Sequence, residues 1–248
     1  MARPSARRPA FSAAPPRACL RLLGGFRLEV DGAWTEPAAG VQRLLAFLAI
    51  RQQPVQRGYA AACLWLDVPD ERAAANLRST LWRLRKLGDW IVVARNGSLR
   101  LHPNVLVDVQ QAAAAARRWL AGGMNDDDLR TGSGAFETDL LPDWYDEWVV
   151  AERERQRQLR LHALEAISDR YLAEGRLGDA LVAALSAVAA DPLRETAHRA
   201  LIRVHLAEGN TGEAIRQVRQ CEQLLHDELG VFPSARLTEL VAGVVGLS

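Results

Sequence analysis

Residues 171–181 and 205–215 carry the same pattern, and this internal repeat constrains the fold more than any other feature of the chain. The two segments read "YLAEGRLGDAL" and "HLAEGNTGEAI", and their matched positions lie 34 residues apart. In each copy a glycine follows the first apolar stretch, and a small alanine stands five residues later. A fixed period of this length is typical of two-helix units that stack on one another, because one unit cannot bury its apolar face alone.

The neighbouring sequence supports a helical array over residues 140–248. A long helical pattern covers 149–175, and Asp191-Pro192 ends the second helix of the first repeat. A further helix spans 214–230 and closes at Gly230, and Pro233 starts a final helix that caps the stack. The period and the two-helix unit are those of the tetratricopeptide repeat, so we predict an all-α domain of this kind.

The net charge is +1, but it divides into a basic half and an acidic half. Residues 1–104 contain 16 Lys and Arg against 7 Asp and Glu, a net charge of +9, whereas residues 105–248 contain 15 against 23, a net charge of −8. This asymmetry indicates that the first half binds a polyanion and the second does not.

The sequence pattern of the first half predicts a small α+β domain over residues 18–104. Tight turns join strands within 19–32, helical spacing covers 41–52 and 57–65, and Pro69 and Asp70 start and cap a third helix. Two β-prone runs then surround Asn96-Gly97 within 90–102, which is a strong hairpin signal. Three helices followed by a hairpin with a basic tip is the order of a winged helix-turn-helix.

The third helix, within "NLRSTLWRLRK" (76–86), carries the candidate binding residues. Its leucines fall on one side, and the opposite side is cationic and carries an indole. Guanidinium groups on such a face can pair with guanine edges or phosphates. The predicted DNA-contact residues on this helix and on the hairpin tip are Arg78, Ser79, Trp82, Arg83, Arg85, Lys86, Arg95 and Asn96.

Several segments together resemble a known family. "LRLLGGFRLEVDG", "VQRLLAFLAI", "NLRSTLWRLRK" and the 91–102 hairpin are similar to the OmpR-type DNA-binding domain that opens the streptomycete antibiotic regulatory proteins (SARP family). "LLPDWYDEWVVAERERQRQL", "DPLRETAHRALIRVHLAEGN" and "LLHDELGVFPSARL" resemble the bacterial transcriptional activator domain that follows it in those regulators. One departure is the wing, where the family often has Gly-Tyr on the return strand and this chain has "NGSLRL".

The resemblance implies a transcription activator with promoter DNA as its partner. It implies binding to direct-repeat promoter sites, with two copies of the chain side by side as a homodimer on DNA, and recruitment of RNA polymerase. The remaining segments are a basic disordered arm at 1–17 and a linker at 105–139, which contains a helix at 107–123 and a Gly-rich loop at 125–139.

Other classes of function are less well supported. The carboxylates at 126–128 and at 139–147 have no nearby His, Cys or phosphate-binding loop, so we expect no enzyme. The five histidines are dispersed and the three cysteines form no CxxC pair, so we expect no metal, no cofactor and a reducing cytoplasm. No apolar run is long enough to span a membrane. The aromatic residues at 144, 145 and 148 fit either an anchor for a partner or the filling of a groove.

A helical-repeat adaptor that binds a protein partner is the alternative function. In that case the winged helix would not read DNA. The placement of charge separates the two, because an adaptor has no need of cations concentrated on the third helix and hairpin. The Arg- and Glu-rich part of 149–175 is better explained as a solvated helix face than as a second nucleic-acid patch.

Overall fold

The computed structural model describes residues 17–123 and 138–245. The predicted disordered arm, apart from Arg17, and most of the predicted loop at 125–139 lie outside the described residues. The chain divides into two compact units. The first contains residues up to Leu20 and Arg27–Leu106, and the second contains Arg21–Phe26 and Val107 onward.

The first three strands of the chain form a four-stranded sheet with the later strand β7, in the order β3-β2-β1-β7. Its strands are β1 (Ala18–Arg21), β2 (Arg27–Val30), β3 (Ala33–Thr35) and β7 (Val105–Val107). β2 and β3 are antiparallel, and Asp31 and Gly32 turn between them at φ of 49° and 84°, as the Asp-Gly pair predicts. β7 is only three residues long and was not expected from the sequence pattern.

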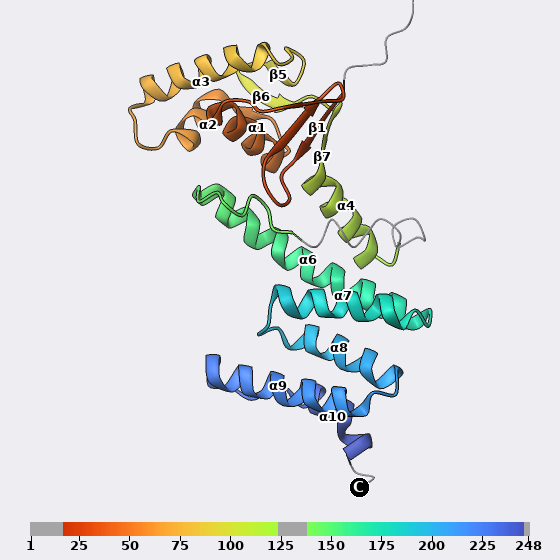
Figure 1. Ribbon diagram of the computed structural model, residues 1–248. Coiled ribbons are helices and arrows are strands. Elements are labelled where there is room, and N and C mark those ends of the chain that lie inside the picture. Colours follow the sequence, from red (N-terminus) through yellow and green to blue (C-terminus); the bar gives the residue numbers. More distant parts are fainter. Residues whose placement is uncertain (1–16, 124–137, 246–248) are drawn as a thin grey trace, which may run out of the picture. The chain divides into compact units, whose positions relative to one another are not determined.

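Three helices and a hairpin complete the first unit. The helices are α1 (Ala39–Arg51), α2 (Arg57–Leu64) and α3 (Asp70–Arg85), and the hairpin is β5 (Val92–Arg95) with β6 (Ser98–Leu101). These elements occur where the sequence predicts them. α3 packs on α1 and α2 (Figure 1). A two-residue strand, β4 (Val55–Gln56), pairs antiparallel with β6 and makes a second sheet in the order β4-β6-β5.

The start of α3 differs in one detail from the expectation. Asp70 does not cap the helix through its side chain; Pro69 occupies the capping position, and Asp70 is the first helical residue. The physical reason is that the proline fixes its own φ at −56° and leaves the acidic side chain inside the first turn. There the carboxylates of Asp70 and Glu71 still meet the positive end of the helix dipole.

The second unit is helical. Its helices are α4 (Asp108–Leu120), α6 (Glu147–Ala173), α7 (Leu177–Ala190), α8 (Glu195–Ala207), α9 (Thr211–Leu229) and α10 (Ala235–Val245). From α6 to α9 each helix packs on the next along the chain, and α10 packs on α8 and α9 (Figure 1). A small β-sheet region therefore precedes a helical domain, as the sequence predicts at this coarse level.

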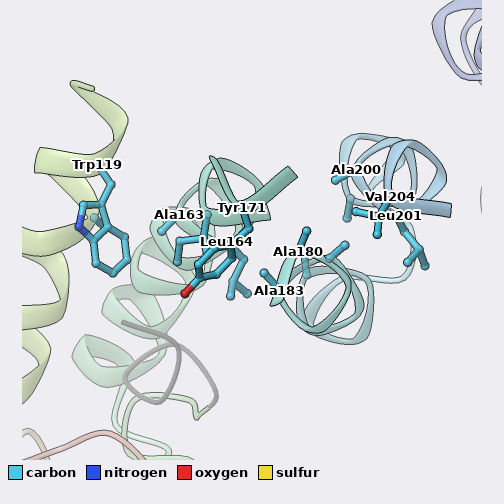
Figure 2. Close-up of a cluster of buried hydrophobic side chains, with 14 of the residues drawn as sticks. Trp119, Ala163, Leu164, Tyr171, Ala180, Ala183, Ala200, Leu201 and Val204 are labelled. Carbon is cyan, nitrogen blue, oxygen red and sulfur yellow. The ribbon is translucent and has the colours of Figure 1, made fainter. Parts of the chain in front are cut away.

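Two buried clusters hold the helices together. The larger joins α4, α6, α7 and α8, and Figure 2 shows Trp119 of α4 facing the α6 side chains, with the small side chains of α7 between α6 and α8. Four alanines of α7 are buried, which allows helix backbones to approach closely. The smaller cluster joins α8, α9 and α10 around Ile202, Cys221 and Leu237.

The repeated residues take equivalent places in the helical unit. Gly175 and Gly209 follow the ends of α6 and α8 at φ of 72° and 77°, a conformation that favours glycine. The matched Ala180 and Ala214 are fully buried. Two ion pairs also join residues one period apart, Arg157 with Asp191 at 2.9 Å and Asp169 with Arg203 at 2.6 Å.

A short segment from the beginning of the chain belongs to the second unit. Residues 21–26 run from the last residue of β1 to the start of β2, yet Leu22 and Leu23 donate their backbone N–H groups to the Asp108 carboxylate at 2.9–3.0 Å. Leu23 also forms a bridge with Leu140, and Phe26 stacks on Trp144 with ring centroids 6.1 Å apart. Burial raises the pKa of Asp108, although its bonds to the backbone N–H groups act in the opposite direction.

Candidate nucleic-acid interface

The outward face of α3 carries six of the predicted site residues. The core side of the helix is formed by Ala73, Leu77, Thr80 and Leu84, which are at least 95% buried. The opposite side is exposed to solvent, as expected for an amphipathic helix. The exposed predicted residues are Arg78, Ser79, Trp82, Arg83, Arg85 and Lys86, the last of which directly follows the final helical residue.

The arginines on this face form no ion pair in the described part of the chain. Within residues 17–123 and 138–245, no ion pair involves Arg78, Arg83 or Arg85. Arg83 and Arg85 lie in the last turn, where positive charge meets the negative end of the helix dipole. The guanidinium groups are therefore tolerated by the helix and are available to an external anion.

Trp82 and Lys86 form a pair on the same face. The Lys86 Nζ lies 4.0 Å from the centroid of the Trp82 ring, which is the geometry of a cation–π contact. Trp82 is nevertheless 59% exposed. Because Trp82 lies on the same exposed face of α3 as the predicted cations and contacts Lys86, it belongs with the candidate interface.

The hairpin places Arg95 and Asn96 at its tip. Asn96 and Gly97 adopt φ of 50° and 76°, the left-handed conformations that a two-residue hairpin turn requires. Both Arg95 and Asn96 are exposed. The strand β4 holds the hairpin by pairing with β6, with Val55 opposite Leu99 and Gln56 opposite Ser98.

Arg57 is a further candidate for this interface, and the sequence interpretation did not select it. It is exposed at the first position of α2, and its backbone N–H donates to the Gly97 carbonyl at 2.9 Å. Arg57 therefore lies beside the hairpin tip, although 38 residues separate it from Arg95 in sequence. No local pattern indicates this, because β4 is too short to show a strand period.

The charged groups of the second unit are used differently. The arginines of α6 pair with carboxylates: Arg155 with Glu152 at 2.6 Å, Arg157 with Glu154 and Asp191 at 2.9 Å, and Arg160 with Asp139 at 2.7 Å. The Arg157 contact holds the pKa of Glu154 at about 2. The face is only partly solvated, because Arg157 and Arg160 are partly buried and bind carboxylates of other segments, but the paired arginines give no support for a nucleic-acid patch here.

His198 and Trp144 of the second unit have structural partners. His198 is fully buried, donates from Nε2 to the Pro192 carbonyl at 2.8 Å and accepts at Nδ1 from Gln217 at 2.6 Å. Trp144 lies between Phe26 and Trp148, so it fills a groove inside this unit, whereas the neighbouring Tyr145 is 84% exposed.

In residues 17–123 and 138–245, no group of three or more His, Cys, Asp or Glu side chains is arranged to hold a metal ion. None of the helices in these ranges has the length and apolar character needed to cross a membrane.

Comparisons with known proteins locate the chain among bacterial regulators. The regulatory protein AfsR of Streptomyces coelicolor is 30% identical over 251 residues, and AfsR of Streptomyces griseus is 26% identical; each alignment covers 96% of this chain. The chain spans only 25% of the length of each of these relatives.

A solved structure shares the fold. Mycobacterium tuberculosis EmbR in complex with a low-affinity phosphopeptide superimposes with a TM-score of 0.73 at 21% identity, covering 94% of this chain and 66% of that one. The model of the bacterial transcriptional activator domain matches residues 106–244, more than half of the chain. The chain therefore belongs to the bacterial transcriptional activator domain family, and it is a regulator of the SARP type.

Proposed function

We propose that the chain regulates transcription by binding double-stranded promoter DNA, as an activator. In this proposal the first unit acts as a winged helix, with α3 in the major groove and the β5–β6 hairpin as the wing. The observation that carries the proposal is the row of exposed cations on α3 with no carboxylate partner in the described residues. Phosphates and guanine edges are the external anions and acceptors that such a row fits best.

The individual residues have different proposed roles. Arg78 and Arg83 read bases, because the planar guanidinium pairs bidentately with a guanine edge. Lys86 holds a phosphate as a point charge, and its contact with Trp82 fixes the ammonium close to the helix. Arg95 and Asn96 at the hairpin tip contact the adjacent groove, and Ser79 and Arg85 complete the surface of α3.

The second unit supports assembly in this proposal. Its helices form a tetratricopeptide-like array that helps two copies bind neighbouring direct repeats and recruits RNA polymerase. Two copies side by side gain affinity because the second binding event takes place at a high effective concentration. The protein carries out no catalytic step in this scheme, and it acts in the cytoplasm, where promoter DNA is available.

The test is binding of the full chain to a duplex selected from a randomised pool, measured by fluorescence anisotropy across a salt series. A protein that contacts about six phosphates should lose roughly a thousandfold in affinity between 50 and 200 mM salt. A shallow dependence, or no binding at low salt, would refute DNA reading and favour the adaptor function.

The reading of bases by Arg83 needs a separate measurement. We expect Arg83→Ala to weaken binding by about 1–3 kcal/mol and to flatten the ranking of duplexes that differ at single base pairs. Arg72→Gln is the matched control, because it removes an exposed arginine from the first turn of the same helix. An unchanged ranking for Arg83→Ala would move Arg83 from the base-reading group to the phosphate-contacting group.

A further inference from the structure

A cleft in the first unit borders the surface proposed to bind DNA, and the function proposed above assigns no ligand to it. It has a volume of about 340 Å³ and opens between the last turns of α3, the beginning of α2 and strand β5. That volume lies within the range of pockets that hold small organic molecules. The cleft lies along the outer edge of the hairpin, because β5 is the terminal strand of the sheet β4-β6-β5.

One part of the lining is apolar and aromatic. Leu81, Leu84 and Val92 form an apolar surface, and Trp90 and His102 lie edge to face with ring centroids 5.6 Å apart. The indole lies close against the backbone at Gly88, where a side-chain Cβ would come within 3.0 Å of the Trp90 Nε1. An aromatic wall beside aliphatic side chains favours a flat or aliphatic ligand body.

The other part of the lining is positively charged. Arg57 and Arg85 both line the cleft, both are exposed, and neither forms an ion pair with the described residues. Asp89 is the single carboxylate of the lining. His102 accepts a hydrogen bond at Nδ1 from the Asn104 N–H at 3.1 Å, so its neutral ring keeps a donor at Nε2. Two guanidinium groups therefore face a single carboxylate in the lining.

We propose that this cleft is a binding site for a small organic anion, a carboxylate carried on an aromatic or aliphatic body. The body packs on Trp90 and the leucines, and the carboxylate pairs with Arg57 and Arg85, whose planar guanidinium groups fit a carboxylate bidentately. The site stands on its own geometry. Its consequence rests on the proposed function: because Arg85 lies both in the cleft and on the DNA-facing side of α3, an occupied cleft weakens DNA binding.

The binding test uses isothermal titration of the full chain with 1-naphthoate. The uncharged 1-naphthamide and inorganic phosphate serve as probes of the ring alone and of the charge alone. We expect 1-naphthoate to bind with Kd below about 1 mM and both other probes to bind at least about tenfold more weakly, because each supplies only one of the two interactions. Equal binding of 1-naphthamide, or no heat with 1-naphthoate up to several millimolar, would overturn the site.

Two substitutions test the position of the ligand. Arg57→Gln should weaken 1-naphthoate about fivefold or more by removing one charged partner, whereas Arg72→Gln, outside the cleft, should leave Kd within about twofold. Gly88→Ala should also weaken it, because the added Cβ would lie 3.0 Å from the Trp90 Nε1 and 3.1 Å from the Ile91 Cδ1, so the side chains at this end of the cleft must shift. If Arg57→Gln and Gly88→Ala both bind as the unsubstituted chain does, the ligand lies elsewhere and the proposal fails.

The regulatory consequence is measured separately, by anisotropy on the selected duplex with and without saturating 1-naphthoate. We expect several-fold weaker DNA binding with the ligand and no change with 1-naphthamide. Binding of 1-naphthoate with undiminished DNA affinity would refute the coupling through Arg85. A chain that binds no duplex at all would refute the proposed function, and the titration would still decide the site.

Discussion

α3 and α6 are both rich in arginine, and they use it in opposite ways. On α3 the guanidinium groups are exposed and unpaired within the described residues. On α6 each arginine is engaged: Arg155, Arg157, Arg160 and Arg170 with carboxylates, and Arg153 with the carbonyls of a preceding loop. The difference arises from the neighbours. A glutamate stands three or four residues from Arg155, Arg157 and Arg170, Arg160 reaches Asp139 from a preceding segment, and no glutamate stands at this spacing around Arg83. Arginine content alone therefore does not indicate an interface.

The largest effect is expected when equal positive charge is removed from α3 and, in a second variant, from α6. The triple variant Arg78→Ala, Arg83→Ala, Lys86→Ala should bind the selected duplex at least about 100-fold more weakly and lower the salt slope by about 2–3. Removing Arg155, Arg157 and Arg170 should change affinity less than about twofold, because those charges are already neutralised. Comparable losses in the two variants, read by anisotropy, would show that net charge and not placement drives binding.

The next largest effect concerns Arg153, the one α6 arginine that binds only backbone. Its guanidinium donates to the carbonyls of Leu140 at 2.8 Å, Trp144 at 2.7 Å and Leu141. Arg153→Met keeps much of the aliphatic length but leaves these acceptors without their donor. We expect a loss of about 2–3 kcal/mol in the free energy of unfolding, measured by urea denaturation. A loss below about 1 kcal/mol would show that water replaces the guanidinium.

The order of helices and strands could be predicted from local sequence patterns. The short segments held by partners distant in sequence could not. The 34-residue period, the Asn96-Gly97 turn and the leucine spacing of α3 each depend on neighbours in sequence, so they indicate helices and hairpin directly. β4, β7 and the segment 21–26 are held by partners distant in sequence, such as Asp108 for Leu22. Likewise the cations of α3 could be selected from the sequence. Arg57 could not, because only the pairing of β4 with β6 brings it beside the hairpin tip.

A third prediction concerns His198, a buried titratable group in the second unit. Burial lowers the pKa of His198 below its usual 6.5, although Pro192, Asp191 and Glu195 act in the opposite direction. The unfolded chain therefore takes up a proton that the folded chain resists, and the stability of this unit should fall as pH drops below about 6.5, by at most about 1.4 kcal/mol per pH unit.

His198→Gln is the variant that isolates this dependence. It removes the titration, so the slope of unfolding free energy between pH 7 and 5 should become shallower than that of the unsubstituted chain. The baseline stability at pH 7 should fall as well, since the contact with Pro192 changes. An equal slope in both proteins would assign the dependence to other groups.

The smallest expected effect is that of an exposed pair on α6. Arg155 is 49% exposed and pairs with Glu152 across one helical turn. Arg155→Ala should change the unfolding free energy by less than about 0.5 kcal/mol, because exposed pairs of this spacing contribute little. A loss as large as that of Arg153→Met would mean that the α6 pairs stabilise the fold and do more than neutralise charge.

The segment 21–26 makes the two units inseparable by a single cut. A fragment that starts at residue 107 retains every helix of the second unit, yet it lacks the Leu22 and Leu23 amides that bind Asp108 and the Phe26 ring that stacks on Trp144. An excised amino-terminal piece would in turn carry those six residues without their partners. Any design that separates, fuses or exchanges the two units must therefore keep residues 21–26 with the second unit.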